Sequence, residues 1–597
     1  MLKNFLSFTL IIFMISCNND KKEAPASSKL RNDPAFSGIK DRAWWKEAVV
    51  YQIYPRSFMD SNGDGVGDLK GIISKLDYIK SLGVDIIWLN PIYGSPNADN
   101  GYDISDYRSI MKEFGTMDDF DSLLKGMHDR GLKLVMDLVV NHCSDEHEWF
   151  KQSRSSRTNP YRDYFHWWPA EKGKPPFRPG AFEVDGSGWR FDSLTNSYYL
   201  HYFSYKQPDL NWENPKLREE IFSMMRSWFD KGVDGFRMDV IPFISKDTTF
   251  PVITKKDIDE KYEGRWDIYL ASGPHVHDYL HEMNEKVLSK YDVMALAEGA
   301  GTTKATALNF VDPERKELNM SYHFDGVSLG YIKGKFKTMD PNWKLTEFKK
   351  IYSDWDSVFE NKGWGTIYLG NHDQPRMVTR WGNDAPEFRE LSSKMLSTFL
   401  LTMRGTPYYY NGDELGMTNA KFDRMEDFRD IETIAEFGKI QQSGGDLQQF
   451  INEQKTGGAR DNGRTPFQWD STANGGFTTG TSWLKVNDNH NTINAAAQEK
   501  DPNSVLNYFR KVVALRKGSP VLIYGKYNLL DKDNPKVYAY TRELNGKKLL
   551  IMLNFSAKNG TPNTGIDISN AKLLINNYPA PGGTNELRPY EALIYEL

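Results

Sequence analysis

The chain has few cysteines, no excess of positive charge and no N-terminal apolar run long enough to cross a bilayer. Two cysteines in 597 residues cannot form a disulfide framework. A formal net charge of −5, with 26% charged residues, leaves no basic surface for a phosphate backbone, which argues against nucleic acid as a partner. The N-terminal apolar run, residues 5–15, is too short for a mature transmembrane helix.

That short run, preceded by Lys3 and followed by a polar stretch, predicts a signal peptide over residues 1–16. Ser16 before Cys17 resembles the lipobox of bacterial lipoproteins, which implies cleavage before Cys17 and a lipid on its thiol. Met14 stands at the usual leucine position, so a plain secretory signal and a soluble secreted or periplasmic protein is the alternative. We expect a cell-envelope protein, anchored in a membrane only by this lipid through a flexible tether, residues 17–40.

The middle of the chain alternates between strand and helix signals. Short runs that are apolar on both faces, as buried parallel strands are, occur at 48–55, 85–92, 132–140, 233–240, 292–299, 317–325, 365–373 and 406–416. Helical patterns separate them, for example at 116–131, where Thr116 and Asp119 form a capping box. Eight such strands predict an α/β protein built on a closed (β/α)8 TIM barrel, spanning 41–141 and 206–518.

Two segments break this alternation. Residues 142–205 are rich in Trp, Pro, Gly and Tyr without a helical period, which predicts an irregular insertion after the third strand, beside a free thiol at Cys143. From 519 to 597 the chain changes to short β runs separated by turn-rich stretches, which predicts a C-terminal β-sandwich.

Three carboxylates stand where strand-like runs end: Asp239, Glu298 and Asp373. A parallel barrel gathers the carboxyl ends of its strands at one face, so these acids are expected to meet in one pocket. A single Asp at such a place is more often a helix cap or turn former, but three together favour catalysis. Aromatic residues reach 13%, with 16 Trp and 31 Tyr; they suit sugar rings, although an aromatic-rich core is the alternative.

Four motifs, in order along the chain, resemble those of glycoside hydrolase family 13, the α-amylase family. They are DLVVNH at 137–142, GFRMDV at 235–240, ALAEG at 295–299 and NHD at 371–373. Two further stretches are similar to the oligo-1,6-glucosidase and α-glucosidase branch: QPDLNW at 207–212 and GRTPFQWD at 463–470. The resemblance runs from about residue 42 to the C-terminus.

The resemblance implies roles for the three acids: Asp239 as nucleophile, Glu298 as acid/base and Asp373 as transition-state stabiliser. A retaining glycosidase needs one ionised and one protonated carboxyl about 5–5.5 Å apart. Arg237, two residues before Asp239 on the same strand face, is expected to keep Asp239 ionised. Glu298, crowded by two anions, is expected to carry the proton.

The resemblance also implies substrate contacts. His142 and His372 would bond the first sugar, while Asp99, Tyr102 and Arg464 would hold the terminal non-reducing glucose and close the pocket, which means exo action. Val240, directly after the nucleophile, goes with α-1,6 linkages in that branch, and Thr with α-1,4.

An Asp/Gly-rich loop after the first strand places oxygens at alternate positions, a spacing suited to calcium. The residues are Asp60, Asn62, Asp64, Val66 through its carbonyl, and Asp68. The twelfth position is Gly71, so this is not an EF-hand, and a plain turn is the alternative. The resemblance favours a structural Ca²⁺.

We therefore expect a monomeric α-glucosidase acting on isomaltose and short isomalto-oligosaccharides. An α-1,4-glucosidase and a sucrose hydrolase, isomerase or trehalose synthase of the same family are the alternatives. A non-catalytic glucan-binding relative is a further alternative. Such a relative should have lost at least one of the three carboxylates, but Asp239, Glu298 and Asp373 are all present.

Overall fold

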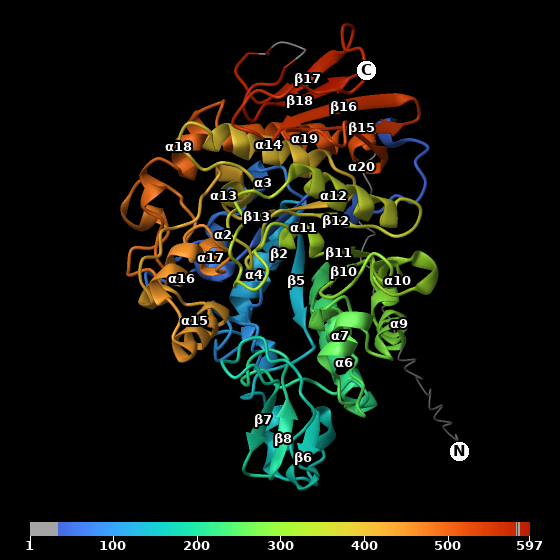
Figure 1. Cartoon of the computed structure of the whole chain (residues 1–597), viewed down its shortest axis with the longest axis vertical. Coiled ribbons are helices and arrows are strands. Elements are labelled where there is room, and N and C mark those ends of the chain that lie inside the picture. The colour runs from blue at the N-terminus through green and yellow to red at the C-terminus, as the bar shows by residue number, and fades with distance from the viewer. Residues whose placement is uncertain (1–33, 581, 583–585) are drawn as a thin grey trace, which may run out of the picture.

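The computed structural model describes residues 34–580, 582 and 586–597 (Figure 1). The predicted signal peptide, the lipidation site Cys17 and most of the predicted tether lie outside these residues. Across the described part of the chain, no helix has the length and apolar character needed to span a membrane.

Eight parallel strands form the centre of the molecule, and each matches one of the eight predicted runs. Their order around the sheet is β11-β10-β9-β5-β2-β1-β13-β12, and a parallel bridge between Ser321 and Gly365 joins the two ends. The prediction of a (β/α)8 barrel is confirmed. The strands are β1 (Val50–Ile53), β2 (Ile86–Leu89), β5 (Lys133–Val139), β9 (Gly235–Asp239), β10 (Met294–Glu298), β11 (Met320–Tyr322), β12 (Thr366–Ile367) and β13 (Thr406–Tyr410).

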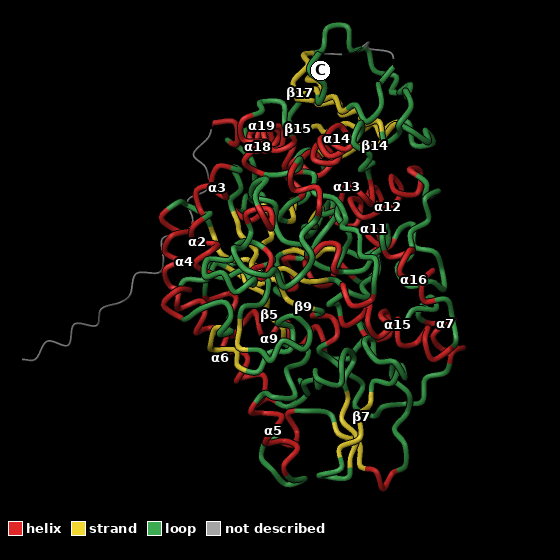
Figure 2. The backbone as a smooth tube through the Cα atoms, turned by 90° about the vertical axis from the view of Figure 1, so that its left-hand side faces the viewer, coloured by secondary structure: helices red, strands yellow, loops and turns green. Residues whose placement is uncertain are grey.

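Helices follow the strands and surround the barrel (Figure 2). The predicted capping box of Thr116 and Asp119 opens α4, and Asn214 caps α6, which ends at the left-handed Gly232. These local signals explain why the predicted helix boundaries agree with the structure. The main barrel helices are α2 (Leu69–Ser74), α3 (Leu76–Ser81), α4 (Met117–Asp129), α6 (Pro215–Lys231), α9 (Val276–Lys286), α10 (Ala307–Val311), α12 (Leu345–Phe359), α14 (Arg389–Thr402) and α19 (Val505–Lys517).

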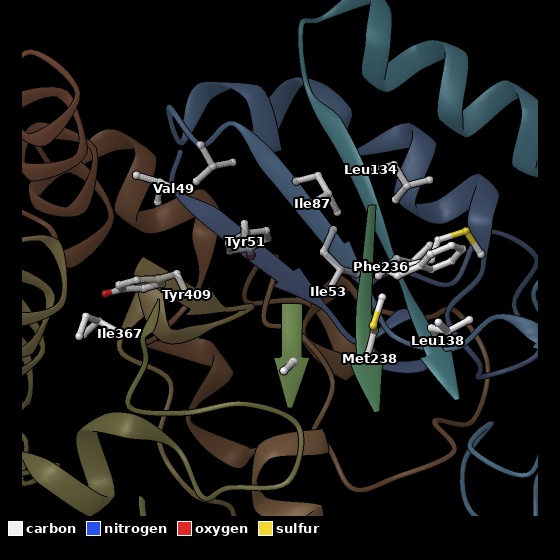
Figure 3. Close-up of a cluster of buried hydrophobic side chains, with 14 of the residues drawn as sticks. Val49, Tyr51, Ile53, Ile87, Leu134, Leu138, Phe236, Met238, Ile367 and Tyr409 are labelled. Atoms are coloured by element: carbon white, nitrogen blue, oxygen red, sulfur yellow. The ribbon is translucent and has the colours of Figure 1, made fainter. Parts of the chain in front are cut away.

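The two-residue period of each strand divides the barrel side chains into an outer and an inner set. Outward residues such as Tyr51, Ile87 and Phe236 pack in one large cluster with the helices (Figure 3). The alternate residues, such as Val50 and Met294, fill the barrel interior as a second cluster. The buried charged side chains of the inner set, such as Arg237, Asp239 and Glu298, lie toward the carboxyl ends of the strands, so the apolar plug supports the site from below.

The inserted segment after β5 forms a small subdomain at one end of the molecule (Figure 1). It is less irregular than we predicted, because it contains helix α5 (Glu148–Ser155) and a three-stranded antiparallel sheet. Its strands, β6 (Trp167–Pro169), β7 (Trp189–Asp192) and β8 (Ser197–Leu200), have three or four residues each, too few to give a clear alternating pattern. The predicted free thiol of Cys143, at the start of this segment, is buried.

The C-terminal domain lies at the opposite end and is antiparallel, as predicted, with its five strands in one sheet (Figure 1). One face, including Tyr538 and Ile551, packs in the cluster shared with the barrel helices. The other face packs against loop residues such as Leu587 and Ile566, so loops replace the second sheet of the predicted sandwich within the described residues. The strands are β14 (Lys526–Leu530), β15 (Val537–Leu544), β16 (Lys547–Asn554), β17 (Lys572–Asn576) and β18 (Ala592–Glu596).

Two buried arginines join this sheet to the barrel. Arg542 on β15 donates to the carbonyls of Thr402, Leu522, Ile523 and Gly525, which end α14 and α20 (Pro520–Tyr524). Arg516 on α19 donates to neighbouring carbonyls at the same place. Burial lowers the pKa of Arg542 to about 10, which still leaves it charged at neutral pH. Cations here satisfy helix-end carbonyls that the interface hides from water.

Replacing Arg542 with Met should destabilise the protein by about 3 kcal/mol or more, because several buried carbonyls lose their donor. Urea unfolding followed by circular dichroism measures this change. The exposed Lys547→Met on the neighbouring strand is the control and should unfold within about 0.5 kcal/mol of the wild type. Equal stability of the two variants would mean that Arg542 does not hold the domains together.

Candidate active site

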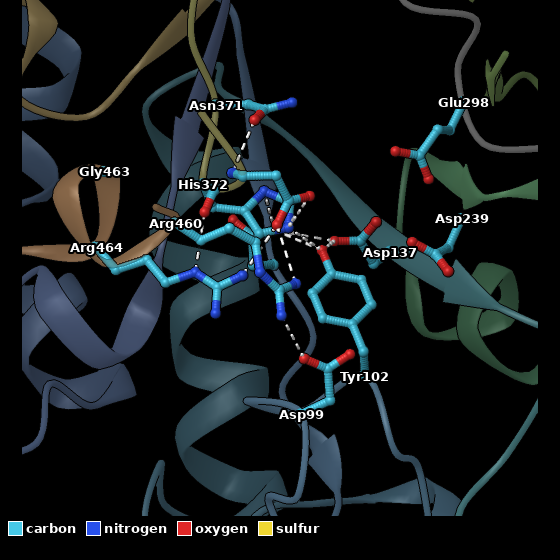
Figure 4. A network of polar contacts seen from close by, with 12 residues as sticks. Asp99, Tyr102, Asp137, Asp239, Glu298, Asn371, His372, Arg460, Gly463 and Arg464 are labelled. Carbon is cyan, nitrogen blue, oxygen red and sulfur yellow. Dashed lines mark hydrogen bonds and ion pairs between the residues drawn. The ribbon is translucent and has the colours of Figure 1, made fainter. Parts of the chain in front are cut away.

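The predicted acids meet at the carboxyl ends of the strands, in a pocket of about 410 Å³. Asp239 is the last residue of β9, Glu298 is the last residue of β10, and Asp373 lies in the loop after β12. Figure 4 shows Asp239 and Glu298 on one side of the site and Arg460 and Arg464 on the other. Seven of the predicted site residues line the pocket: Asp99, Tyr102, His142, Asp239, Val240, Glu298 and Asp373.

Arg237 lies beneath Asp239 and Glu298 and contacts both carboxylates. Its Nη1 is 2.8 Å from Asp239 and 2.7 Å from Asp137, and its Nη2 is 2.7 Å from Glu298. The Tyr322 hydroxyl accepts from Nε and Nη2. One fully buried guanidinium therefore fixes the positions of three buried carboxylates.

The protonation of these carboxylates follows from their burial. Burial and the neighbouring Glu298 raise the pKa of Asp239 well above its usual value, against the opposing effect of Arg237. Burial likewise raises the pKa of Asp137 to about 6. The contact between Arg237 and Asp239 is as predicted, but the charge of Arg237 is shared among three acids, and burial opposes its effect on Asp239.

Val240 follows Asp239 with a left-handed backbone, at φ +34°, a conformation that β-branched residues rarely adopt. This turn directs its N–H to Glu298, whose Oε2 accepts at 2.8 Å. Glu298 thus receives two donors, Val240 and Arg237, whereas Asp239 receives one. The strained turn positions the acid/base candidate relative to the nucleophile candidate.

Asp373 lies in a cationic environment opposite the first two acids. Its Oδ1 is 2.9 Å from Arg464 and 3.4 Å from Arg460, and its Oδ2 is 3.2 Å from His372. Burial alone would raise the pKa of Asp373, but these three neighbours outweigh burial and hold it well below its usual value. This lowered pKa favours the ionised form of Asp373, which is suited to stabilising positive charge on a sugar ring.

Tyr102 and His372 form a stacked pair next to this anion, with ring centroids 5.3 Å apart. His372 Nε2 lies 2.7 Å from the Tyr102 hydroxyl, and its Nδ1 lies 2.9 Å from the Gln52 amide. Tyr102 also donates to Asp137. His372 does not line the pocket, so it orients Asp373 and Tyr102 from behind.

The arginine in the pocket differs from our prediction. We expected Arg464 to hold the terminal glucose together with Asp99 and Tyr102, but the arginine that lines the pocket is Arg460, with its Nη2 3.1 Å from Oδ1 of Asp99. Arg464 is fully buried behind the pocket, where it donates to Asp373 and to the His372 carbonyl. The two arginines are one helical turn apart, at either end of α17 (Asp461–Arg464), and the motif alone does not reveal which one faces the pocket.

Other pocket residues were not predicted from the sequence. Gln207 donates to Asp99 and also lies 3.2 Å from His142. In the sequence, only its position in the QPDLNW motif could have identified it as a site residue. Lys337 and Glu432 form an ion pair of 2.6 Å in the pocket wall. Lys337 lies in a loop and Glu432 in the first turn of α15 (Ile431–Ser443), 95 residues apart, and no local pattern marks either of them.

The predicted calcium loop is folded around its own side chains. Asp60 accepts from the N–H groups of Asn62, Gly63 and Gly65 and from the Thr478 hydroxyl, which fills its four acceptor positions. Asp68 caps α2 through Gly71. The exposed Asn62 and Asp64 retain oxygens that suit a hard cation, and a cation would replace at least one donor on Asp60. Among the described residues, no group of three or more His, Cys, Asp or Glu is arranged to hold a metal.

Comparison with known proteins agrees with this geometry. The family model described as the α-amylase catalytic domain matches residues 52–525. This chain belongs to the α-amylase family. The fold, the strand-end acids and this match together indicate a glycoside hydrolase, as predicted.

The chain is similar to curated enzymes over nearly its whole length. It is 50% identical to the oligo-1,6-glucosidase of Parageobacillus thermoglucosidasius, covering 93% of this chain and 99% of that protein. It is 49% identical to the oligo-1,6-glucosidase of Bacillus cereus, covering 93% and 100%. Among solved structures, the trehalulose synthase of Pseudomonas mesoacidophila MX-45 matches with a TM-score of 0.88 and 45% identity, covering 93% of this chain and 99% of that one.

Two site histidines predict how stability depends on pH. Burial lowers the pKa of both His142 and His372 to about 3, so both rings are neutral in the folded protein. Between about pH 6.5 and 3 the unfolded chain binds protons that these rings do not, so the free energy of unfolding falls as the pH falls. At pH 4.5 each ring should account for up to about 2.7 kcal/mol of this loss.

Thermal unfolding at pH 7.5 and 4.5 tests this linkage in the wild type and in the double variant His142→Gln/His372→Gln. The variant should lose less stability on acidification than the wild type, because its amides do not titrate. Equal losses in the two proteins would show that the histidines do not contribute.

Proposed function

We propose that this protein is a retaining, exo-acting α-glucosidase that prefers α-1,6 linkages, with isomaltose and short isomalto-oligosaccharides as substrates. The observation that carries the proposal is the arrangement of Asp239 and Glu298 above Arg237, in a pocket that the Asp99–Arg460 ion pair also lines. The likeness to the oligo-1,6-glucosidases supports the choice of linkage.

The chemistry follows from the charges of the three acids. Asp239 attacks the anomeric carbon and forms a covalent glucosyl ester, while Glu298 donates a proton to the leaving oxygen. Glu298 then takes a proton from a water molecule, and this water attacks the anomeric carbon and cleaves the ester, so the anomeric configuration is retained. Asp373 stays ionised and stabilises the oxocarbenium-like transition state.

Burial raises the pKa of Asp239, whereas the reaction needs Asp239 ionised and Glu298 protonated. A proton on Asp239 would have to pass to Glu298 before the attack. Both carboxylates contact the same guanidinium, so the change requires little rearrangement of the protein.

Asp239→Asn should lower kcat by about 10³-fold or more, because the amide cannot form the ester. Product analysis on isomaltose, maltose and sucrose measures both rate and specificity. Asp129→Asn, an exposed change of the same type on α4, is the control and should keep full activity. Full activity in Asp239→Asn would refute the nucleophile assignment. A wild-type protein that hydrolyses none of the three sugars would refute the proposed function.

A second candidate is isomerisation of sucrose, which the likeness to trehalulose and isomaltulose synthases supports. Such enzymes share the acids but keep the intermediate from water. Release of glucose and fructose from sucrose favours hydrolysis, whereas a disaccharide product favours isomerisation.

Val240 is proposed to set the linkage preference, because it lines the pocket directly after the nucleophile. One apolar contact changes discrimination by about 1–3 kcal/mol, or about 10- to 200-fold. Val240→Thr keeps the β-branched shape and should raise the maltose-to-isomaltose ratio of kcat/KM by about tenfold. Val327→Thr, at another apolar position of the pocket lining, is the matched control. An unchanged ratio in Val240→Thr would mean that Val240 does not set the linkage preference.

A structural Ca²⁺ is proposed at Asp60, Asn62, Asp64, Val66 and Asp68, on the basis of their all-oxygen donor set. At 100 times its dissociation constant, Ca²⁺ should add about 2.7 kcal/mol to the free energy of unfolding, and EGTA should remove it. Thermal unfolding with each addition measures this, with Asp64→Ala as a variant that loses the response. Identical midpoints in Ca²⁺ and EGTA would mean that the loop is an ordinary turn.

We also propose that the protein is monomeric and anchored to the cell envelope by lipid on Cys17, on the basis of the lipobox-like Ser16–Cys17 step. Mass analysis of the mature N-terminus distinguishes a lipidated Cys17 from a cut at another residue, and the latter outcome would favour a secreted protein.

A further inference from the structure

A row of four charged side chains of alternating sign lines the active-site pocket. Asp99 lies 3.1 Å from Nη2 of Arg460, and Nε of Arg460 lies 3.6 Å from Glu432. The same oxygen of Glu432 is 2.6 Å from Nζ of Lys337, which ends the row. Asp99 is among the residues expected to hold the terminal glucose. The second pair, Glu432 and Lys337, has no part in the chemistry proposed above.

Lys337 belongs to the loop between α11 (Asp325–Ser328) and α12, and this loop is held in place without the Lys337 ammonium group. The Gly458 N–H donates to the Lys337 carbonyl at 2.9 Å. Lys335, two residues earlier, forms an ion pair with Glu453. These contacts use the backbone and the neighbouring side chains, so the pairing of Lys337 with Glu432 is not what fixes the loop.

The backbone of Lys337 is strained. Its φ of +38° lies in the left-handed region, which a residue with a side chain adopts at a cost in free energy and a glycine does not. Strain of this kind persists where the surrounding structure imposes it, and it is concentrated at binding and catalytic sites. A lysine at this position therefore indicates that the site requires the side chain and not the turn alone.

The pair of Lys337 and Glu432 can still bind hydroxyl groups. An ammonium group has three N–H donors, and Glu432 is the one hydrogen-bond partner of Lys337 Nζ within the part of the chain that the structure describes. Each of the two side chains is 22% exposed. Burial would lower the pKa of Lys337, but the charge of Glu432 raises it, so the ammonium group stays charged. Because the two charges cancel, the pair suits an uncharged polar group better than an anion.

We propose that Lys337 and Glu432 bind hydroxyl groups of the glucose that leaves, and so determine which sugars are accepted next to the terminal glucose. The inference rests on the proposed function, in which Glu298 protonates the oxygen of this leaving sugar. The pair follows Asp99 and Arg460 in the row, so it lies where a second sugar extends from the first.

The chemistry of the pair fits a single sugar ring. An ammonium group donates and a carboxylate accepts, so Lys337 and Glu432 together can bind two hydroxyl groups of one ring. Both residues determine specificity, and neither transfers the proton or the glucosyl group.

Two substrates that share the terminal glucose test this proposal. Isomaltose releases glucose, whereas p-nitrophenyl α-glucoside releases an aromatic ring that has no sugar hydroxyls. Lys337→Met removes the charge and keeps a long side chain, so its kcat/KM should fall at least tenfold more for isomaltose than for the aromatic glucoside. Glu432→Gln should change the ratio of the two kcat/KM values in the same direction, by at least threefold. Lys335→Met, in the same loop, is the matched control and should keep both values within twofold of the wild type.

A structural role and a binding role give different results. Distortion of the pocket would lower kcat/KM equally for the two substrates, and equal losses in both variants would overturn the proposal. A ratio within twofold of the wild type in both variants would also overturn it, while the proposed function would stand. A wild-type protein that cleaves neither substrate would refute the proposed function itself, and this proposal with it.

Discussion

The contact on which the rest of the structure depends is the buried guanidinium of Arg237. It lies among Asp137, Asp239 and Glu298, so it joins the carboxyl ends of β5, β9 and β10, and through Tyr322 that of β11. Three buried carboxylates without this cation would repel one another and lose their donors. Half of the barrel rim and the two carboxylates that we propose to be catalytic are therefore held by the same side chain, so the same contact serves the fold and the site.

Charge is distributed unequally across the pocket, and this asymmetry gives similar acids different roles. Asp239 shares one guanidinium with two other carboxylates, and its pKa is raised. Asp373 has Arg460 and Arg464 beside it, and its pKa is lowered. One side therefore favours a protonated carboxyl group and the other an ionised one. The pair of Asp99 and Arg460 also lines the pocket on the second side.

The sequence predicts those features that local patterns encode. Buried runs, capping residues and strand-end acids are local, and they identify the eight strands, the cap of α4 and the positions of Asp239 and Glu298. The choice between Arg460 and Arg464 is not local, because both are basic and one turn apart, and packing decides which one faces the pocket. The Lys337–Glu432 pair and the loop layer of the C-terminal domain likewise depend on contacts between distant segments.

The ring of strands is not equally strong around its circumference. Strand β12 has only two residues and β11 three, and a single bridge between Ser321 and Gly365 joins these neighbours. Few backbone hydrogen bonds must break there, so local opening at this seam takes less free energy than elsewhere in the barrel. The loop that carries Asp373 leaves β12, so the acid that we propose to stabilise the transition state is attached to the strand whose amides should exchange with solvent first.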